Sequence, residues 1–449
     1  MAPLTILTDG DVRSLLRSLS HEDVTTMQTS LAEALHTYST GTQEDYACSV
    51  NQPDRTAITL RHGTTTLFMP ASTADTTGVK TVTISEQTFR QCQASSATPI
   101  SSTTGPSSAS SFSTSNSTSA STTSLPSPSP SSTSINTPTT PASSIASDQS
   151  TTPRGSLTIL SHTGSPLGLL AAEELTAFRT ALAATLLLKK REHVSTITVF
   201  GAGKQAYWHI RLALLLRGAD IHRVNIINRT FARAQPLLQD FHTSGLVGKH
   251  TKMSILSAEY VEYERLLKEE VRKADVIFCC TPSLTPLFPA EHLTATEGRK
   301  KGRLVSAIGS YKPHMLELHP DILRQATAPH HAHHHHHKHA QNSGVVVVDS
   351  LSATLKEAGE VVQAGLGPQQ LVEVGELVML KKQAMKGNGG KQDVAVGGGK
   401  GEKGGLTDWL SKGNVIYKSV GLGLMDLTVG MDLVRLAGEK GVGTRVPDF

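Results

Sequence analysis

Short β-branched runs alternate with helical patterns over much of the chain after residue 190. Between these runs, apolar residues recur at intervals of three and four, which is the spacing of helices that bury one face. Strands that alternate with helices are typical of a parallel sheet covered on both faces. The pattern therefore predicts a doubly wound domain over residues 191–424, with strands at 196–200, 224–227, 276–280, 304–308 and 345–348.

The first part of the chain mixes helices and strands without that alternation. Helical patterns begin at Asp9 and at Asp23. Strand-like runs and a long apolar helix follow, and they cover residues 57–60, 66–69, 79–84, 156–160 and 171–190. We expect an α+β domain built from residues 1–93 and 154–190 and completed by an amphipathic C-terminal helix within residues 425–449.

Three segments lack the apolar residues that a core needs. Residues 94–153 are mostly Ser, Thr and Pro, which predicts a disordered insertion. Residues 329–343 contain a histidine run, and residues 386–405 form a flexible loop rich in Gly and Lys. A solvated histidine run has no fixed geometry and no supporting hydrogen bonds, so we predict no metal centre.

Composition narrows the cellular compartment and the classes of binding partner that we expect. The 449 residues carry a formal charge of +4, without a basic stripe interleaved with aromatics, and this argues against nucleic acid. Only four cysteines occur, and the adjacent Cys279 and Cys280 suit neither a disulfide framework nor zinc. The chain has no run of eighteen apolar residues and no leader pattern. We expect a soluble, cytoplasmic protein that does not bind membranes.

A glycine turn between the first predicted strand and helix of the doubly wound domain predicts a dinucleotide site. Gly201 allows the sharp turn, Gly203 lets the backbone approach a pyrophosphate, and Ala206 permits close packing of helix on strand. The amides at the start of the helix favour an anion. The candidate cofactor residues are Gly201, Ala202, Gly203, Lys204, Gln205 and Ala206.

The end of the next strand favours NADP(H) over NAD(H). An acidic residue there would accept from the ribose 2′-hydroxyl of NAD and repel a 2′-phosphate. This chain has Asn228, Arg229 and Thr230 instead, with Arg233 one turn later. A guanidinium suits a phosphate. The alternative is that Arg229 is only a solvated charge, and that the cofactor is NAD(H). At the end of a further strand, Thr281, Pro282 and Ser283 are expected to line the nicotinamide ribose.

Several motifs in order resemble the ornithine cyclodeaminase/mu-crystallin family. They are Phe68-Met-Pro-Ala71 with Gly78-Val-Lys-Thr-Val82, Leu175-Thr-Ala-Phe-Arg-Thr-Ala181, the glycine turn with His209, Thr281-Pro-Ser283, Ala307-Ile-Gly-Ser-Tyr-Lys-Pro313 with Glu317-Leu318, and Tyr417-Lys-Ser-Val-Gly421. The resemblance implies a dimerisation and substrate domain, a Rossmann domain, NAD(P)(H) chemistry on a small amino or imino acid, and a homodimer.

The same resemblance implies a cationic clamp for the substrate carboxylate. Lys80, Arg179 and Arg55 stand at positions similar to those that hold the carboxylate in the family. Arginine suits a planar carboxylate through two parallel N–H bonds. The family-like motifs also imply that Gly309 contacts the cofactor, and that Lys418 contacts either the cofactor or the substrate.

One position departs from the cyclodeaminase pattern. That pattern has an acidic residue just after the glycine of the Gly309 loop, where this chain has Tyr311 followed by Lys312. A phenol with an unperturbed pKa near ~10 is a poor base at neutral pH. Tyr311 is predicted either to donate a hydrogen bond or to pack at the pocket wall, and Lys312 to add charge toward the carboxylate.

These residues predict an NADP(H)-dependent oxidoreductase that reduces a ketimine or cyclic imino acid to an amino acid. Two alternatives stay open. An ornithine cyclodeaminase would release ammonia and form proline with recycled cofactor, and a non-enzymatic protein would bind NADP without turnover.

Overall fold

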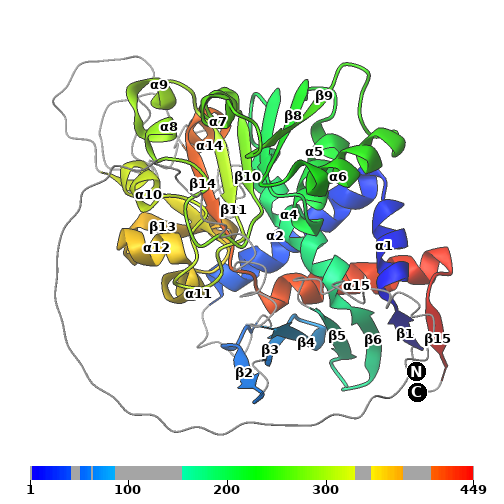
Figure 1. The fold of residues 1–449 in the computed structure, drawn as a ribbon. Helices are drawn as coiled ribbons and strands as arrows, with labels where there is room; N and C mark the ends of the chain where they lie inside the picture. The colour runs from blue at the N-terminus through cyan, green and yellow to red at the C-terminus, as the bar shows by residue number, and fades with distance from the viewer. Residues whose placement is uncertain are drawn as a thin grey trace, which may run out of the picture. The chain divides into compact units, whose positions relative to one another are not determined.

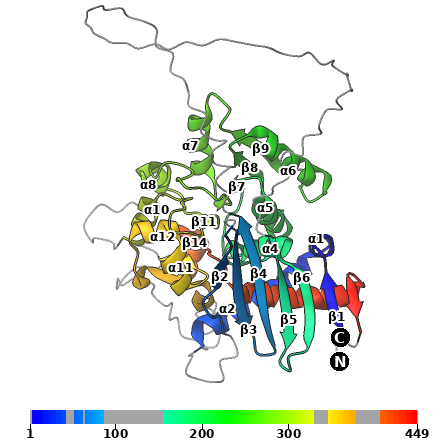
Figure 2. The same cartoon turned by 60° about the horizontal axis from the view of Figure 1, so that its bottom comes forward.

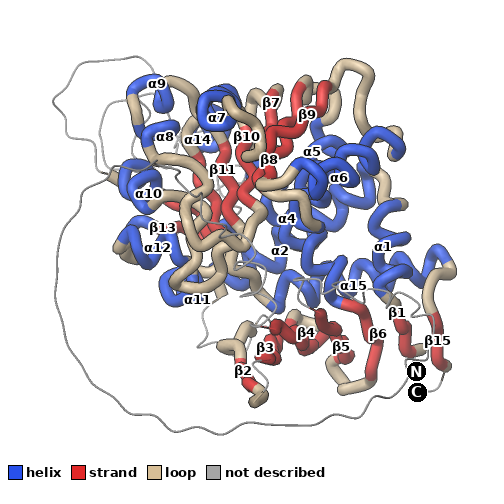
Figure 3. Tube along the Cα trace, viewed as in Figure 1, coloured by secondary structure: helices blue, strands red, loops and turns tan. Residues whose placement is uncertain are grey.

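Two β-sheets organise the computed structural model (Figures 1 and 3). The structure describes residues 3–41, 51–61, 64–85, 154–328, 345–377, 406–447 and 449. Contacts group Met1–Ile84 and Pro153–Phe449 into one unit, and both sheets form within it. The low-complexity segments at 94–153, 329–343 and 386–405 lie outside the described residues. Among the helices that the structure describes, none is long and apolar enough to cross a membrane.

The smaller sheet has seven strands in the order β15-β1-β6-β5-β4-β3-β2. Strands β1 and β6 are parallel, whereas β5 is antiparallel to both β4 and β6. Although β5 follows the Ser/Thr/Pro-rich segment, it pairs with β4 and sets Leu157 opposite Lys80, so the strand predicted beyond that segment is confirmed. The strands are β1 (Leu4–Leu7), β2 (Thr56–Thr59), β3 (Thr64–Ser72), β4 (Thr76–Ser85), β5 (Arg154–Ser161), β6 (Pro166–Ala171) and β15 (Thr444–Val446).

The C-terminal helix α15 (Gly423–Lys440) covers one face of this sheet. It packs against β3, β5 and β6, as Figure 2 shows, so the helix predicted at the C-terminus does return to the first sheet. Alternation along β4 buries Lys80 and Val82 on one face and leaves Val79 exposed on the other. Helix α15 also packs against three further helices, α1 (Asp9–Arg17), α2 (His21–Thr40) and α4 (Ala172–Leu188).

The larger sheet has eight parallel strands in the order β13-β12-β14-β11-β10-β7-β8-β9. They are β7 (Thr196–Phe200), β8 (Arg223–Asn228), β9 (Lys252–Ser257), β10 (Val276–Cys279), β11 (Leu304–Ala307), β12 (Val346–Val348), β13 (Leu371–Glu373) and β14 (Val415–Lys418). The connecting helices are α5 (Lys204–Arg217), α6 (Phe231–Thr243), α7 (Tyr263–Lys273), α8 (Glu291–Thr294), α9 (Thr296–Arg299), α10 (Pro320–Thr327), α11 (Leu351–Glu357), α12 (Gly359–Ala364), the 3-10 turn η1 (Pro368–Gln370) and α14 (Leu406–Lys412).

Strand order in the parallel sheet reverses at β7. The chain runs outward from β7 through β8 to β9, and then crosses to β10 on the other side of β7. Ligands of doubly wound sheets bind outside the carboxyl ends of the strands at such a point. The predicted fold class is confirmed, and its candidate site lies at the ends of β7 and β10. All five predicted strands of this sheet are present, but β9, β13 and β14 were not predicted.

Candidate functional site

The turn between β7 and α5 has the geometry that the glycine motif predicts. Gly201 adopts a φ of +107°, and its N–H donates to Ile227 O at 2.8 Å. A Cβ at position 201 would lie 2.8 Å from Cys280 O, so glycine is needed there for both conformation and space. At the exposed Gly203, a Cβ would meet no atom of the described residues within 4 Å. The backbone at Gly203 is therefore open to close approach by a ligand.

The start of α5 completes a candidate phosphate site. Gly203 is the N-cap residue, so the N-cap position itself supplies no side-chain hydrogen bond to the helix. Amides at an uncapped N-terminus attract anions. Ala206 is fully buried, and the buried Gln205 Oε1 has no hydrogen-bond partner among the described residues. The half-buried Ala202 lies within the turn itself. These features fit a dinucleotide pyrophosphate held by residues 201–206.

The side chain of Lys204 is occupied by protein partners. Its Nζ lies 2.7 Å from Glu174 Oε2 and 2.9 Å from Glu173 Oε1, both on α4. These two carboxylates offset the positive charge of the Lys204 ammonium, which would otherwise attract a phosphate. The arrangement indicates that this side chain joins α5 to α4, while the backbone of Lys204 stays part of the turn.

The residues predicted at the ribose end lie together where β8 passes into α6. Asn228 ends β8, and its Nδ2 donates to Thr230 O at 2.8 Å, which fixes the loop. Arg229 and Arg233 are exposed. The structure therefore places two exposed guanidinium groups within one short loop and the first turn of a helix.

An acidic residue that the sequence did not reveal lies beside this loop. Glu259 Oε2 accepts from Phe231 N and from Ser257 Oγ, each at 2.9 Å. Ser257 Oγ also lies 3.1 Å from Arg229 O. The hydrogen bond from Phe231 holds the pKa of Glu259 below its usual range. Glu259 follows β9, and that strand was missed, so no sequence signal pointed to it.

Glu317 ties together the two loops that follow β10 and β11. Its Oε1 accepts from Thr281 N at 2.7 Å, and its Oε2 accepts from Gly309 N at 2.6 Å. A Cβ at Gly309 would lie 1.8 Å from Thr281 O, so the loops touch backbone to backbone. Burial raises the pKa of Glu317 to about 7, and Lys418 opposes this. The predicted cofactor residues Thr281, Pro282, Ser283 and Gly309 are thus held at one edge of the sheet.

Lys418 lies inside the protein beneath these loops. Its Nζ donates to Ser310 Oγ at 2.6 Å and lies 3.5 Å from Glu360 Oε2. Ser310 also donates to Glu360. These partners indicate that Lys418 supports the loop after β11. The contact with cofactor or substrate that the resemblance implies for Lys418 stays a prediction. Glu360 was missed because its helix lies far away in the sequence.

The structure brings together two of the predicted substrate cations, Lys80 and Arg179. Both contact one carboxylate oxygen, Asp426 Oδ1, from Lys80 Nζ at 2.8 Å and from Arg179 Nε at 3.2 Å. A Cβ at Gly421 would lie 2.8 Å from Arg179 Nη2, and Gly421 N donates to Asp349 Oδ2 at 2.7 Å. Because Gly421 follows β14, this cation cluster (Lys80, Arg179 and Asp426) lies at the carboxyl edge of the parallel sheet.

Burial lowers the pKa of Lys80 to about 8. That value also includes the charges nearby, because Asp426 raises this pKa and Arg179 and Arg55 lower it. Arg55 itself is partly exposed and pairs with Glu357 Oε2 on α11 at 2.7 Å. Arg55 therefore acts on Lys80 through its charge.

Tyr311 and Lys312 are half-buried on the loop after Ser310. This loop follows β11 at the same edge of the sheet as Thr281. The hydrogen-bonding role predicted for Tyr311 and its alternative of packing at the pocket wall both stay predictions.

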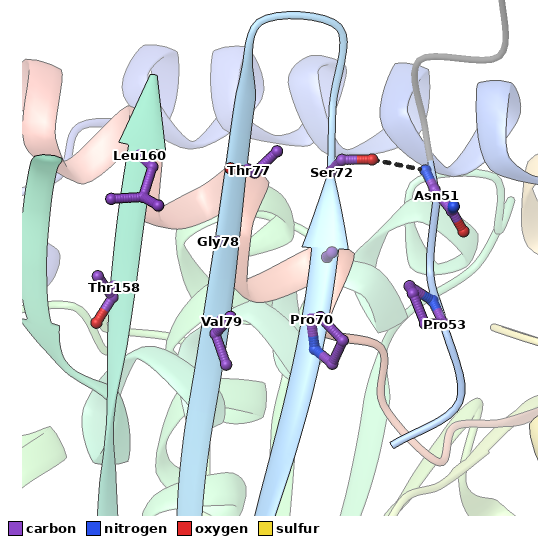
Figure 4. Close-up of a pocket in the computed structure, with 10 residues that line it drawn as sticks. Asn51, Pro53, Pro70, Ser72, Thr77, Gly78, Val79, Thr158 and Leu160 are labelled. Carbon is purple, nitrogen blue, oxygen red and sulfur yellow. Dashed lines mark hydrogen bonds between the residues drawn. The ribbon is translucent and has the colours of Figure 1, made fainter. Parts of the chain in front are cut away.

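A separate pocket lies on the other face of the smaller sheet, away from α15 (Figure 4). Val79, Thr158 and Leu160 line it from β4 and β5, and Pro53 and Pro70 lie at its side. Lys80, the next residue along β4, is buried on the opposite face. The pocket is therefore distinct from the cation cluster.

Comparisons with known proteins identify the family and the fold. A model of the ornithine cyclodeaminase/mu-crystallin family matches residues 146–370. Delta(1)-pyrroline-2-carboxylate reductase of Bacillus cereus (strain ZK / E33L) is 28% identical over 292 residues, covering 64% of this chain and 71% of that protein.

Two solved structures show the same fold. The Thermococcus litoralis Delta(1)-pyrroline-2-carboxylate reductase, in complex with NADH and L-proline, has a TM-score of 0.62 at 17% identity and covers 98% of this chain and 100% of that one. An archaeal alanine dehydrogenase dimer with bound NAD has a TM-score of 0.62 at 19% identity and covers 100% of both chains. Because the family model spans half of the sequence, this chain belongs to the ornithine cyclodeaminase/mu-crystallin family.

Proposed function

We propose that this protein is an NADP(H)-dependent reductase of a cyclic imino acid or ketimine. The observation that carries the proposal is the cation cluster at the carboxyl edge of the parallel sheet, the edge at which the glycine turn lies. The similarity to a pyrroline-2-carboxylate reductase supports the same substrate class. In this proposal the parallel sheet supplies the cofactor turn, and the elements packed with the smaller sheet supply the cations.

The proposed reaction adds two hydrogens across a C=N bond. The bound reduced dinucleotide supplies a hydride for the imine carbon. Arg179 and Lys80 hold the substrate carboxylate, which fixes that carbon in the reactive geometry. Lys80, protonated below a pKa of about 8, is our candidate for giving the imine nitrogen its proton. The product is an amino acid and the oxidised dinucleotide.

Turnover tests this proposal directly. Purified protein is mixed with NADPH and a panel of cyclic imino acids, and loss of NADPH absorbance is followed beside amino-acid formation. We expect stoichiometric amino acid with at least one five- or six-membered cyclic imine. Ammonia release from ornithine without net cofactor consumption would point to a cyclodeaminase. NADPH binding without either reaction would point to a binding protein.

We propose NADP(H) as the cofactor because Arg229 and Arg233 lie exposed at the ribose end. Replacing Arg229 by alanine is expected to weaken NADPH binding about 10-fold or more, since a charge-assisted bond to phosphate contributes about 1.5–3 kcal/mol. NADH binding should change less than about twofold. Fluorescence titration of both cofactors measures this.

The matched control is Arg223→Ala, which removes an exposed arginine from the other end of β8. It should leave both affinities unchanged. Equal weakening of NADPH and NADH by Arg229→Ala would contradict a 2′-phosphate contact and favour NAD(H).

We also propose that the protein is a cytoplasmic homodimer. The smaller sheet exposes Ile58, Val79 and Leu169 on the face that α15 does not cover. Exposed apolar residues on one sheet face suit a second copy of the chain. The free Cys279 and Cys280 suit a reducing compartment.

A further inference from the structure

Asp426 joins the two predicted substrate cations at the start of α15. The carboxylate is fully buried, and its Oδ1 accepts from Lys80 Nζ at 2.8 Å and from Arg179 Nε at 3.2 Å. Its Oδ2 is buried without a hydrogen-bond partner among the described residues. One oxygen atom therefore connects β4, α4 and α15, while the other is left without a protein donor.

The charges around Lys80 are strongly unbalanced without Asp426. Lys80 faces Asp426 on α15, Arg179 on α4, and Arg55 from the segment before β2. Lys80 and Arg179 are each at most 4% exposed, so solvent screens their repulsion poorly. An isolated buried cation sheds its proton or disfavours the fold. Asp426 is the carboxylate that both cations contact.

We propose that Asp426 is a positioning residue of the active site, which holds the Lys80 ammonium and the Arg179 guanidinium side by side for one substrate carboxylate. Asp426 meets Arg179 through Nε, which leaves the Nη1 and Nη2 groups to other partners. Nη1 lies 3.4 Å from the weak acceptor Met425 Sδ, and Gly421 leaves room beside Nη2. The part that concerns substrate rests on the proposed function.

A second consequence concerns protonation. Burial lowers the pKa of Lys80 to about 8, and Asp426 opposes this lowering. Neutralising Asp426 should therefore let Lys80 lose its proton at a lower pH. Removing Arg179 should do the reverse, because its positive charge lowers the same pKa.

Asp426→Asn tests the proposal on the full-length protein. We expect the pKa of Lys80 to fall by about one unit or more, since an opposite charge at this distance shifts a pKa by about 1–3 units. The alkaline limb of the kcat/KM profile should move by the same amount. KM for the imino acid should rise about 10-fold, with the NADPH dissociation constant changed less than about twofold. Asp426→Glu keeps the charge and should keep the pH profile.

The pKa of Lys80 is also measured without turnover, by NMR of lysine carrying carbon-13 at Cε, with Lys80→Arg identifying the signal. Arg179→Gln should raise this pKa, which supplies a second test if Asp426→Asn fails to fold in circular dichroism. If both variants shift the pKa of Lys80 as expected but the protein turns over no imine, the proposed function is refuted and the electrostatic role of Asp426 is not. Unchanged Lys80 titration in folded Asp426→Asn, or no rise in Arg179→Gln, overturns the proposal.

Discussion

Replacing Gly203 by aspartate is expected to weaken dinucleotide binding at least about 100-fold while leaving the fold intact. A Cβ at this position meets no atom within 4 Å in the part of the chain that the structure describes, so this part accommodates the side chain. Aspartate is also a favourable N-cap residue, and it suits the extended backbone of Gly203. A carboxylate near a pyrophosphate, however, repels it by about 4 kcal/mol at an effective dielectric of 20. Cofactor titration and thermal denaturation measure the two effects separately.

Asparagine at the same position is the matched control. It has nearly the size of aspartate and also caps helices, but it carries no charge. Gly203→Asn should therefore cost much less affinity than Gly203→Asp, at an equal melting temperature. If Gly203→Asp is as stable as the parent chain and still binds NADPH normally, the pyrophosphate does not lie at this turn.

This turn illustrates what local sequence predicts well. Gly201, Gly203 and Ala206 lie within six residues, and each is required by the backbone of one strand–turn–helix unit. The observed left-handed φ at Gly201 and the open space at Gly203 follow from that local requirement. The alternation of strands and helices likewise predicted the doubly wound sheet, because each buried parallel strand is a short apolar run.

Partners that are far apart in the sequence escaped prediction. Lys80 and Asp426 are 346 residues apart, and Lys418 at the end of β14 lies against Glu360 of helix α12. A charged residue in an amphipathic pattern is ordinarily assigned to the solvent side. Only the folded chain shows that these charges are neutralised inside it. Strand β14 was missed for a related reason, since a four-residue run that ends in a buried lysine has no clear period.

Replacing Lys80 by methionine should reduce kcat/KM for the imino acid about 100- to 1000-fold. Truncating one partner of a buried charged pair costs about 2–5 kcal/mol, and each 1.4 kcal/mol corresponds to a tenfold change. Methionine keeps much of the length and volume of the 2%-exposed lysine but cannot hold a carboxylate or give a proton. NADPH affinity should change less than about twofold, because the glycine turn lies on other elements.

The pH dependence of the parent enzyme supplies the matching test. Below a pKa of about 8 Lys80 is a cation, so kcat/KM should be level there and should fall as pH rises above that value. Lys80→Arg retains the charge at all these pH values, so its residual activity should lack this alkaline fall. Lys80→Met should lack it too, at a much lower rate. If Lys80→Met instead loses melting temperature and NADPH binding in proportion to activity, Lys80 serves the fold and the substrate carboxylate is held elsewhere.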